Sequence, residues 1–374
     1  MAGEWHSYKI GELGKVITGK TPSTTEPENF GGPYPFITIP DLVQKVYIDT
    51  SERTLSEIGA SKMKTLLLPP NSVMMSCIAT IGKCGITTKP SFTNQQINSV
   101  ICNPDIVDPL FLYYVFTQIG HQLESAGGGG SVYTNVSKSR FSEISVLLPP
   151  LPEQRTIAAV LGALDDKIEL NRRMNRTLEA MAQAVFRHWF VENEEAEGWK
   201  IGDVSYFAQV RSGERPMTTK KIADAEYKYP LFGGGGIMAY TNKSLYDSPI
   251  LLTGRVGTLG GIFRISYPCW ASDNTLVLIP LKPENYYYLY FHLKQIDFEM
   301  LNRGSTQPLL TQSDLQKIEA PLPPDRLLGE FTRVVSPIFA KIDANEQQSR
   351  TLAALRDALL PKLLRGEVRV TVHE

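Results

Sequence analysis

The chain has 374 residues and a formal net charge of −1, with 38 Lys and Arg against 39 Asp and Glu. This length is enough for two or more domains, each with its own hydrophobic core. No apolar run reaches the ~18 residues of a transmembrane helix, and the N-terminus lacks the apolar segment of a signal peptide, so we expect a cytoplasmic protein with no membrane partner. The four cysteines have no paired spacing, as is typical of a reducing compartment. The balanced charge argues against a nonspecific nucleic-acid coat but allows a reader of base edges whose positive charge is local.

Residues 1–152 have the pattern of a globular α+β domain. Short β-rich runs at Tyr34–Ile39, Ser72–Ile78 and Asn98–Ile101 are separated by clusters of Gly, Pro and Asn. A helix is predicted at Leu110–Leu123. The run LPPLPEQ at 148–154 predicts an extended exit from this domain, because proline disfavours helix in the residue before it.

A long helix is predicted from Glu153 to Phe190. Its apolar or Asn positions step by four and three residues without an intervening proline, which is the pattern of a heptad seam. Its 38 residues would span about 57 Å. The seam positions are Ile157, Leu161, Leu164, Ile168, Asn171, Asn175, Leu178, Ala182, Val185 and Trp189.

The second half of the chain repeats this plan. β-rich runs at Pro249–Leu252 and Thr275–Ile279 and a predicted helix at Tyr286–Leu301 precede a second heptad helix. Pro361 is expected to kink or end that helix, and Gly366 to close it. Its seam positions are Phe331, Val335, Ile338, Ile342, Asn345, Ser349, Leu352, Arg356, Leu359 and Leu363.

An internal repeat relates the two halves. The LPP run at 148–150 recurs at 322–324, and about fifteen identities share this offset of 174 residues between 130 and 190. The offset between the globular parts instead drifts between about 175 and 195. The repeat predicts approximate two-fold symmetry. We expect the two helices to pair as an antiparallel coiled coil, because each begins where a globular part ends.

Both seams contain polar residues at corresponding places, Asn171 and Asn175 in the first and Asn345 and Ser349 in the second. A polar residue inside a seam costs stability but can set the register and the partner. The alternative is that the helix turns its apolar face away at this point, so that these side chains lie in solvent.

One motif is misleading. The run GKVITGKT at 14–21 has the spacing of a Walker A phosphate loop. Such a loop must be followed by a helix whose N-terminus meets the phosphates, but Pro22, Pro27 and Pro33 exclude a helix here. Lys20 is better interpreted as a contact to a DNA phosphate.

Patterns typical of catalysis or metal binding are missing. The histidines have no helical ligand spacing, and neither a Gly-x-Ser-x-Gly elbow nor the Asn/Asp-Pro-Pro-aromatic tetrapeptide of amino-methyltransferases occurs. The paired carboxylates Asp165 and Asp166 lie on the long helix, where a solvated face is the simpler interpretation. We therefore expect no catalytic residue, no metal site and no cofactor bound by this chain.

Polar loops in the two globular parts are the candidates for binding. Asn and Gln side chains can pair with adenine, and Arg or Lys with guanine, although turn formation alone also accounts for such residues. The loop at 93–96 in the first half has a polar counterpart at 272–275 in the second. The candidate DNA-contacting residues are Lys20, Thr21, Ser23, Lys83, Asn94, Gln95, Gln96, Ser131, Tyr133, Asn135, Arg211, Arg215, Lys220, Lys221, Arg255, Asn274, Ser305 and Gln307.

The chain resembles the specificity subunits of type I restriction–modification enzymes. The proline joint and helix at 147–190 look like the central conserved region of that family, and LLPKLLRGEVRV at 359–370 is similar to its distal conserved end. The runs at 9–32 and 228–242 resemble the beginnings of target recognition domains. The resemblance implies target recognition domains at 1–152 and 197–325, a central conserved helix at 153–196 and a distal conserved helix at 326–374.

The resemblance also implies a function. Each globular domain would read one half of a split, asymmetric sequence in double-stranded DNA, and the paired helices would fix the gap between the halves. Two adenine methyltransferase subunits using S-adenosylmethionine would dock on this chain, and translocase–endonuclease subunits using ATP and Mg would join them. Two alternatives are a coiled-coil scaffold that does not read DNA and a nucleotide hydrolase or nuclease that acts alone.

Overall fold

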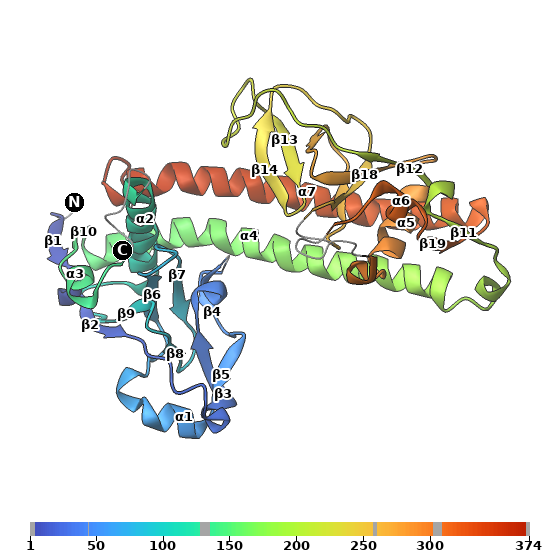
Figure 1. Cartoon of the computed structure of the whole chain (residues 1–374). Helices are drawn as coiled ribbons and strands as arrows, with labels where there is room; N and C mark the ends of the chain where they lie inside the picture. Colours follow the sequence, from blue (N-terminus) through green and yellow to red (C-terminus); the bar gives the residue numbers. More distant parts are fainter. Residues whose placement is uncertain (1–3, 44, 128–134, 257–259, 302–308, 372–374) are drawn as a thin grey trace. The chain divides into compact units, whose positions relative to one another are not determined.

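The structure is a computed structural model of the chain and describes residues 4–43, 45–127, 135–256, 260–301 and 309–371. Two compact units are present: unit 1 comprises Met1–Arg173 with Asn345–Glu374, and unit 2 comprises Met174–Ala344. The two long helices, α4 (Leu151–Phe186) and α7 (Asp325–Leu364), each contribute residues to both units (Figure 1). Among the helices in the described ranges, none is long and apolar enough to cross a membrane.

Unit 1 contains three sheets, with strand orders β2-β9-β6-β7-β4, β5-β3-β8 and β1-β10. All pairs are antiparallel except β4 with β7 and β3 with β8. The strands are β1 (His6–Lys9), β2 (Gly14–Thr18), β3 (Phe30–Ile37), β4 (Tyr47–Ile48), β5 (Arg53–Leu55), β6 (Ser72–Ser76), β7 (Cys84–Thr87), β8 (Phe92–Thr93), β9 (Ile97–Cys102) and β10 (Ser145–Leu148). The helices besides α4 and α7 are α1 (Glu57–Lys62), α2 (Pro109–Gly127) and α3 (Lys138–Ser142).

The core of unit 1 lies between its main sheet and α2. Helix α2 packs on β6 and β7, and its buried Phe116 meets Phe141 of α3 edge to face. The long helices complete this core, since Ile157 and Leu161 of α4 and Leu360 of α7 belong to the same buried cluster. The ends of the long helices are therefore part of the hydrophobic core of unit 1.

Unit 2 repeats this architecture with sheets β12-β18-β15-β16, β14-β13-β17 and β11-β19. The pair β13–β17 is parallel, as the pair β3–β8 is in unit 1. The elements are β11 (Ile201–Asp203), β12 (Ala208–Ser212), β13 (Tyr229–Gly233), β14 (Gly236–Thr241), β15 (Ile250–Gly254), β16 (Phe263–Ile265), β17 (Trp270–Ala271), β18 (Thr275–Pro280), β19 (Glu319–Pro321), α5 (Asn285–Leu293) and α6 (Gln312–Gln316).

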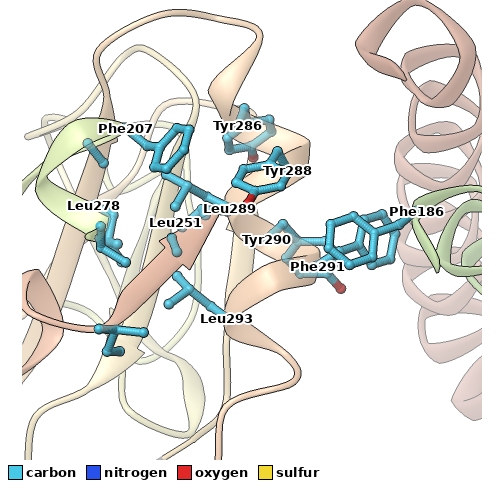
Figure 2. Close-up of a cluster of buried hydrophobic side chains, with 14 of the residues drawn as sticks. Phe186, Phe207, Leu251, Leu278, Tyr286, Tyr288, Leu289, Tyr290, Phe291 and Leu293 are labelled. Carbon is cyan, nitrogen blue, oxygen red and sulfur yellow. The ribbon is translucent and has the colours of Figure 1, made fainter. Parts of the chain in front are cut away.

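The core of unit 2 is unusually aromatic. Phe186 of α4 lies beside Tyr290 and Phe291 of α5, whereas Leu289 and Leu293 of α5 lie on the side of Leu251 (Figure 2). The ring centroid of Phe186 is 5.4 Å from that of Phe291 and 6.0 Å from that of Phe331 of α7. Large rings bury much apolar area and interact through their edges, so this cluster is a principal source of stability in unit 2.

The heptad seams are confirmed as buried or half-buried positions, because none of the twenty predicted residues is exposed. The solvent interpretation of the polar positions is wrong. Asn171 is fully buried, and its amide nitrogen lies 2.9 Å from Gln348 Oε1 and 3.2 Å from Ser349 Oγ of α7 within unit 1. Asn175 makes a corresponding bond in unit 2, to the carbonyl oxygen of Ile342. These polar residues bridge α4 and α7 in each unit.

The start of helix α4 differs from the prediction. Helix α4 begins at Leu151, because Pro152 lies in the first turn, where a helix needs no backbone N–H donor. Helix α7 includes Pro337 in its interior and continues three residues past Pro361. It is closed as predicted by Gly366, whose φ of +68° suits a residue without a side chain.

The predicted helix at Tyr286–Leu301 is wrong as a single element. Helix α5 ends at Leu293, and a separate short 3₁₀ helix follows at Phe298–Leu301. The Asp297 carboxylate accepts the N–H of Glu299 at 3.0 Å, so it caps the start of the second segment.

A half-buried histidine should make the stability of unit 2 depend on pH. Burial lowers the pKa of His292 from its usual 6.5, and its Nε2 donates to the carbonyl oxygen of Glu319 at 2.9 Å. As pH falls below about 6.5, the unfolded state binds the proton first, so stability should decrease until the lower folded pKa is passed. Denaturant unfolding between pH 7.5 and 5.5 should show this slope, and H292Q should flatten it. An equal slope in both proteins would contradict the prediction.

Candidate functional site

In unit 1, the polar loops that follow β2 and β8 lie against each other at one end of the sheet. Their backbones form a hydrogen-bond framework that also includes the end of β6 and the segment before α3. The bonds run from Gly19 N–H to Ile97 O, Lys20 N–H to Thr93 O, Ile97 N–H to Asn94 O, Asn94 N–H to Ile37 O, Cys77 N–H to Gln96 O and Val136 N–H to Cys77 O, with donor–acceptor distances of 2.8–3.3 Å. The structure therefore brings Lys20, Asn94, Gln95 and Gln96 together.

Unit 2 contains the same framework, bond for bond. The equivalent bonds run from Gly213 N–H to Thr275 O, Glu214 N–H to Ala271 O, Thr275 N–H to Ser272 O, Ser272 N–H to Phe232 O, Arg255 N–H to Asn274 O and Leu310 N–H to Arg255 O, at 2.9–3.0 Å. The isolated bridge between Ile78 and Asn135 in unit 1 also has a counterpart, between Val256 and Leu309.

Glycine is required where the two loops cross. A Cβ atom at Gly19 would lie 2.2 Å from the carbonyl oxygen of Thr93, and one at Gly213 would lie 2.2 Å from that of Ser272. Any side chain would clash with backbone at both places. The same close approach of backbones therefore fixes the loops in both units.

The loop side chains divide into those that shape the loop and those that face outward. Asn94 is buried, donates to Gln96 Oε1 at 3.0 Å and accepts the N–H of Gln96 at 3.1 Å, so it stabilises the turn. Gln95 is exposed, and its Oε1 accepts a hydrogen bond of 2.7 Å from the Thr21 hydroxyl. The Gln95 amide nitrogen is left as an oriented donor.

The other predicted residues of unit 1 that the structure describes lie beside the end of β6 or later in the loop after β2. The carbonyl oxygen of Lys83 accepts the N–H of Ser76 at 2.8 Å, which places this lysine beside the end of β6. Asn135 pairs with Ile78 across the same end. Ser23 is more distant in the loop after β2, where its hydroxyl bonds to that of Thr25. Ser131, Tyr133, Ser305 and Gln307 lie outside the described residues.

The predicted cations of unit 2 differ in their environment. Lys220 is engaged within the protein, because it pairs with Asp224 and lies 4.5 Å from the Tyr227 ring. By contrast, within the described part of the chain no ion pair is formed by Arg211, Arg215, Lys221 or Arg255, nor by Lys20 of unit 1. These charges are available for a charged ligand.

Glu214 and Asp273 were missed as candidates in the sequence. Both are exposed, and they occupy the places of Lys20 and Gln95 in the shared framework. Glu214 could have been found from the sequence by aligning Gly19 with Gly213, because Lys20 and Glu214 are the residues that follow these two glycines.

An open pocket of about 620 Å³ lies beside the loops of unit 2. The turn Gly233–Gly236 lines it together with Val256, Ser272 and Asn274. The hydroxyl oxygen of Ser272 is buried without a partner in the described structure. The pocket leaves room for a ligand next to the exposed Asn274 side chain.

The Walker-like run does not form a phosphate loop. Gly14–Thr18 is the extended strand β2, and the next helical turn is a three-residue 3₁₀ segment at Pro27–Asn29. No long helix is present to direct its N-terminus at a phosphate in this segment.

The described ranges also contain no cluster of His, Cys, Asp or Glu that could hold a metal ion. Burial raises the pKa of the Cys77 thiol to about 11 and that of Cys269 to about 12, so neither provides a thiolate near neutral pH.

Comparison with known proteins assigns the chain to a family. The chain matches the type I restriction modification DNA specificity domain over residues 2–180 and again over residues 193–352. The chain belongs to the family of type I specificity subunits. The two matches correspond to the doubled framework described above.

Similar proteins match either nearly the whole chain or about half of it. The specificity subunit of the type I restriction enzyme MjaIX from Methanocaldococcus jannaschii is 29% identical, with 98% of this chain and 94% of the relative covered. The HindI specificity subunit from Haemophilus influenzae is 39% identical, over 46% of this chain and 38% of its own length. A crystal structure of the type I S subunit from M. genitalium shares 18% identity with a TM-score of 0.60, covering 96% of each chain. This last similarity shows that the type I specificity subunit fold is shared.

Proposed function

We propose that residues 1–152 and 197–325 are two target recognition domains, each of which reads one half of a split DNA sequence through its polar loops. The observation that carries this proposal is the shared framework with different exposed side chains, which is what two readers of unlike half-sites require. Unpaired cations and oriented amides on these loops supply contacts to phosphates and base edges.

The helices at 153–196 and 326–374 are proposed to form an antiparallel coiled coil that sets the gap between the half-sites. Within unit 1, Asp165 bonds to Arg356 and Asn171 to Ser349, so residue numbers fall along α7 as they rise along α4. Within unit 2, Asn175 bonds to Ile342 in the same sense. These contacts support the pairing, and the buried seam supports a stiff spacer.

The chemistry is proposed to belong to partner subunits. Two adenine methyltransferase subunits would carry S-adenosylmethionine and flip the target base, and translocase–endonuclease subunits would use ATP and Mg. This division suits a chain whose described residues include no metal cluster and no thiolate available near neutral pH. The two repeats offer similar docking surfaces for two copies of one partner.

Mapping of methylated adenines in cells with and without this chain tests the function. We expect methylation at one bipartite asymmetric motif that disappears when the chain is removed. Methylation that persisted without the chain would favour a scaffold that does not read DNA. ATP hydrolysis by the purified chain that is lost in K20A would favour an enzyme acting alone.

Lengthening the spacer should change the gap in the motif. One heptad inserted after Arg173 in α4 and one after Ala344 in α7 fall at the boundary between the units and preserve the contacts within each. Seven helical residues add about 10 Å, which corresponds to about three base pairs. The methylated motif should keep both half-sites while its gap grows by about three. An unchanged gap would exclude the spacer role.

A further inference from the structure

We propose that three equivalent side chains determine base choice in each unit: Lys20, Gln95 and Gln96 in unit 1, and Glu214, Asp273 and Asn274 in unit 2. This inference rests on the proposed reading of DNA. It further assigns opposite hydrogen-bonding characters to the two units, so that unit 1 selects acceptor-rich base edges and unit 2 selects base edges that donate.

The equivalence of these positions follows from the backbone framework. The N–H groups of Lys20 and Glu214 donate to equivalent carbonyl oxygens, those of Thr93 and Ala271, at 3.0 and 2.9 Å. The carbonyl oxygens of Gln96 and Asn274 accept equivalent bonds from the residue after β6 and after β15. Gln95 and Asp273 stand directly before them in the chain. Side chains at these positions therefore leave the backbone at matching places.

These side chains are exposed to an incoming ligand. Lys20, Gln95, Glu214, Asp273 and Asn274 are exposed, and Gln96 is half-buried. The charged members form no ion pair within the described structure. Buried Asn94 and Ser272, one position before Gln95 and Asp273, belong to the loop interior instead. A surface charge without a protein partner loses no internal bond when it contacts DNA.

The free groups of unit 1 are donors. Lys20 contributes an ammonium group, which can only donate. The Oε1 atoms of Gln95 and Gln96 accept bonds from Thr21 and Asn94, at 2.7 and 3.0 Å, and their NH₂ groups have no acceptor among the described residues. In the major groove, guanine presents two acceptors, N7 and O6, and suits this set best.

The free groups of unit 2 are mainly acceptors. The carboxylates of Glu214 and Asp273 can only accept when ionised, and the exposed Asn274 amide can do both. Exocyclic amines of cytosine or adenine are the major-groove donors that match them. The base edge that faces this loop should therefore differ between the two half-sites: guanine is read by unit 1, and the amino group of cytosine or adenine is read by unit 2.

Isosteric substitutions test this assignment. Q95E with Q96E replaces the two NH₂ groups by carboxylate oxygens while keeping an acceptor for Thr21 and Asn94. In the methylation map of cells expressing this variant with its partners, guanine at one position of one half-site should lose roughly 5- to 150-fold in preference. E214Q with D273N should weaken the preference for cytosine or adenine at one position of the other half-site only.

Controls separate the failure of this inference from failure of the proposed function. Q122E introduces a single Gln→Glu change at an exposed position of α2 and should leave the motif unchanged. Thermal unfolding should match the wild type in all variants, because the changed side chains are exposed except for half-buried Gln96, where glutamate keeps the acceptor for Asn94. A wild-type chain with no bipartite motif would overturn the proposed function itself. A normal wild-type motif that neither double variant alters, or that changes in both halves at once, would overturn the inference alone.

Discussion

Replacing Arg356 by methionine should destabilise unit 1 by about 3–5 kcal/mol, because the change leaves a buried carboxylate without its cation. The side chain of Asp165 on α4 is 9% exposed and is held by Arg356 of α7 and by the hydroxyl of Tyr114 on α2, at 2.6 Å. This cluster joins three helices of unit 1. Burial and the neighbouring carboxylate both raise the pKa of Tyr114, so its hydroxyl remains a donor throughout the ordinary pH range.

A double-mutant cycle should show that the cost comes from the unpaired charge and not from lost packing. D165N with R356M removes both charges at nearly constant volume and should recover at least half of the loss. Y114F should cost about 1.5–3 kcal/mol, the value of a hydrogen bond to a charged group. Hydrogen exchange of the α2 amides reports unit 1 specifically. A loss below about 1 kcal/mol in R356M would mean that water reaches Asp165 and compensates for the arginine.

The long helices could be predicted from the sequence because their determinants are local. Residues three and four apart meet on one face, so the repeating apolar pattern alone identified seam positions that all turned out to be shielded. The roles of Asn171 and Asn345 could not be settled in the same way. Whether an asparagine in a seam is solvated or hydrogen-bonded depends on the facing helix. For Asn171, Gln348 and Ser349 of α7 supply the hydrogen-bond partners.

The loops of the two units could be predicted as polar segments but not aligned. The sequence pattern aligned the loop at 93–96 with 272–275. The equivalent hydrogen bonds instead make Asn94 the counterpart of Ser272 and Gln96 the counterpart of Asn274, so the true alignment is shifted by one residue. This register is set by pairing of β8 with β3 and of β17 with β13, between strands distant in sequence. The connection after β3 is also longer in unit 1, where it includes β4, β5 and α1. An alignment of the two halves from residue composition alone therefore places the loops in the wrong register.

Replacing Phe186 by alanine should destabilise unit 2 by about 3–5 kcal/mol, the usual cost of emptying the site of a buried ring. Its side chain is 2% exposed and contacts four other rings, those of Phe190, Tyr288, Phe291 and Phe331. These four rings come from the segment after α4, from α5 and from α7, so one substitution in α4 weakens the contact of both long helices with α5. Alanine loses the transfer energy of the ring and leaves a cavity that surrounding rings cannot fill without changing rotamer.

M181A is the matched control, because Met181 lies on the same helix with 53% of its surface exposed and should change stability by no more than about 0.5 kcal/mol. Hydrogen exchange should separate the units in F186A. Amides of β15 and β18 should lose protection by a factor set by the destabilisation, whereas those of β6 and β9 should not, because the core of unit 1 contains none of the rings around Phe186. Equal loss of protection in both units would instead show that α4 and α7 couple the unfolding of the two units, so that neither unit could be exchanged without disturbing the other.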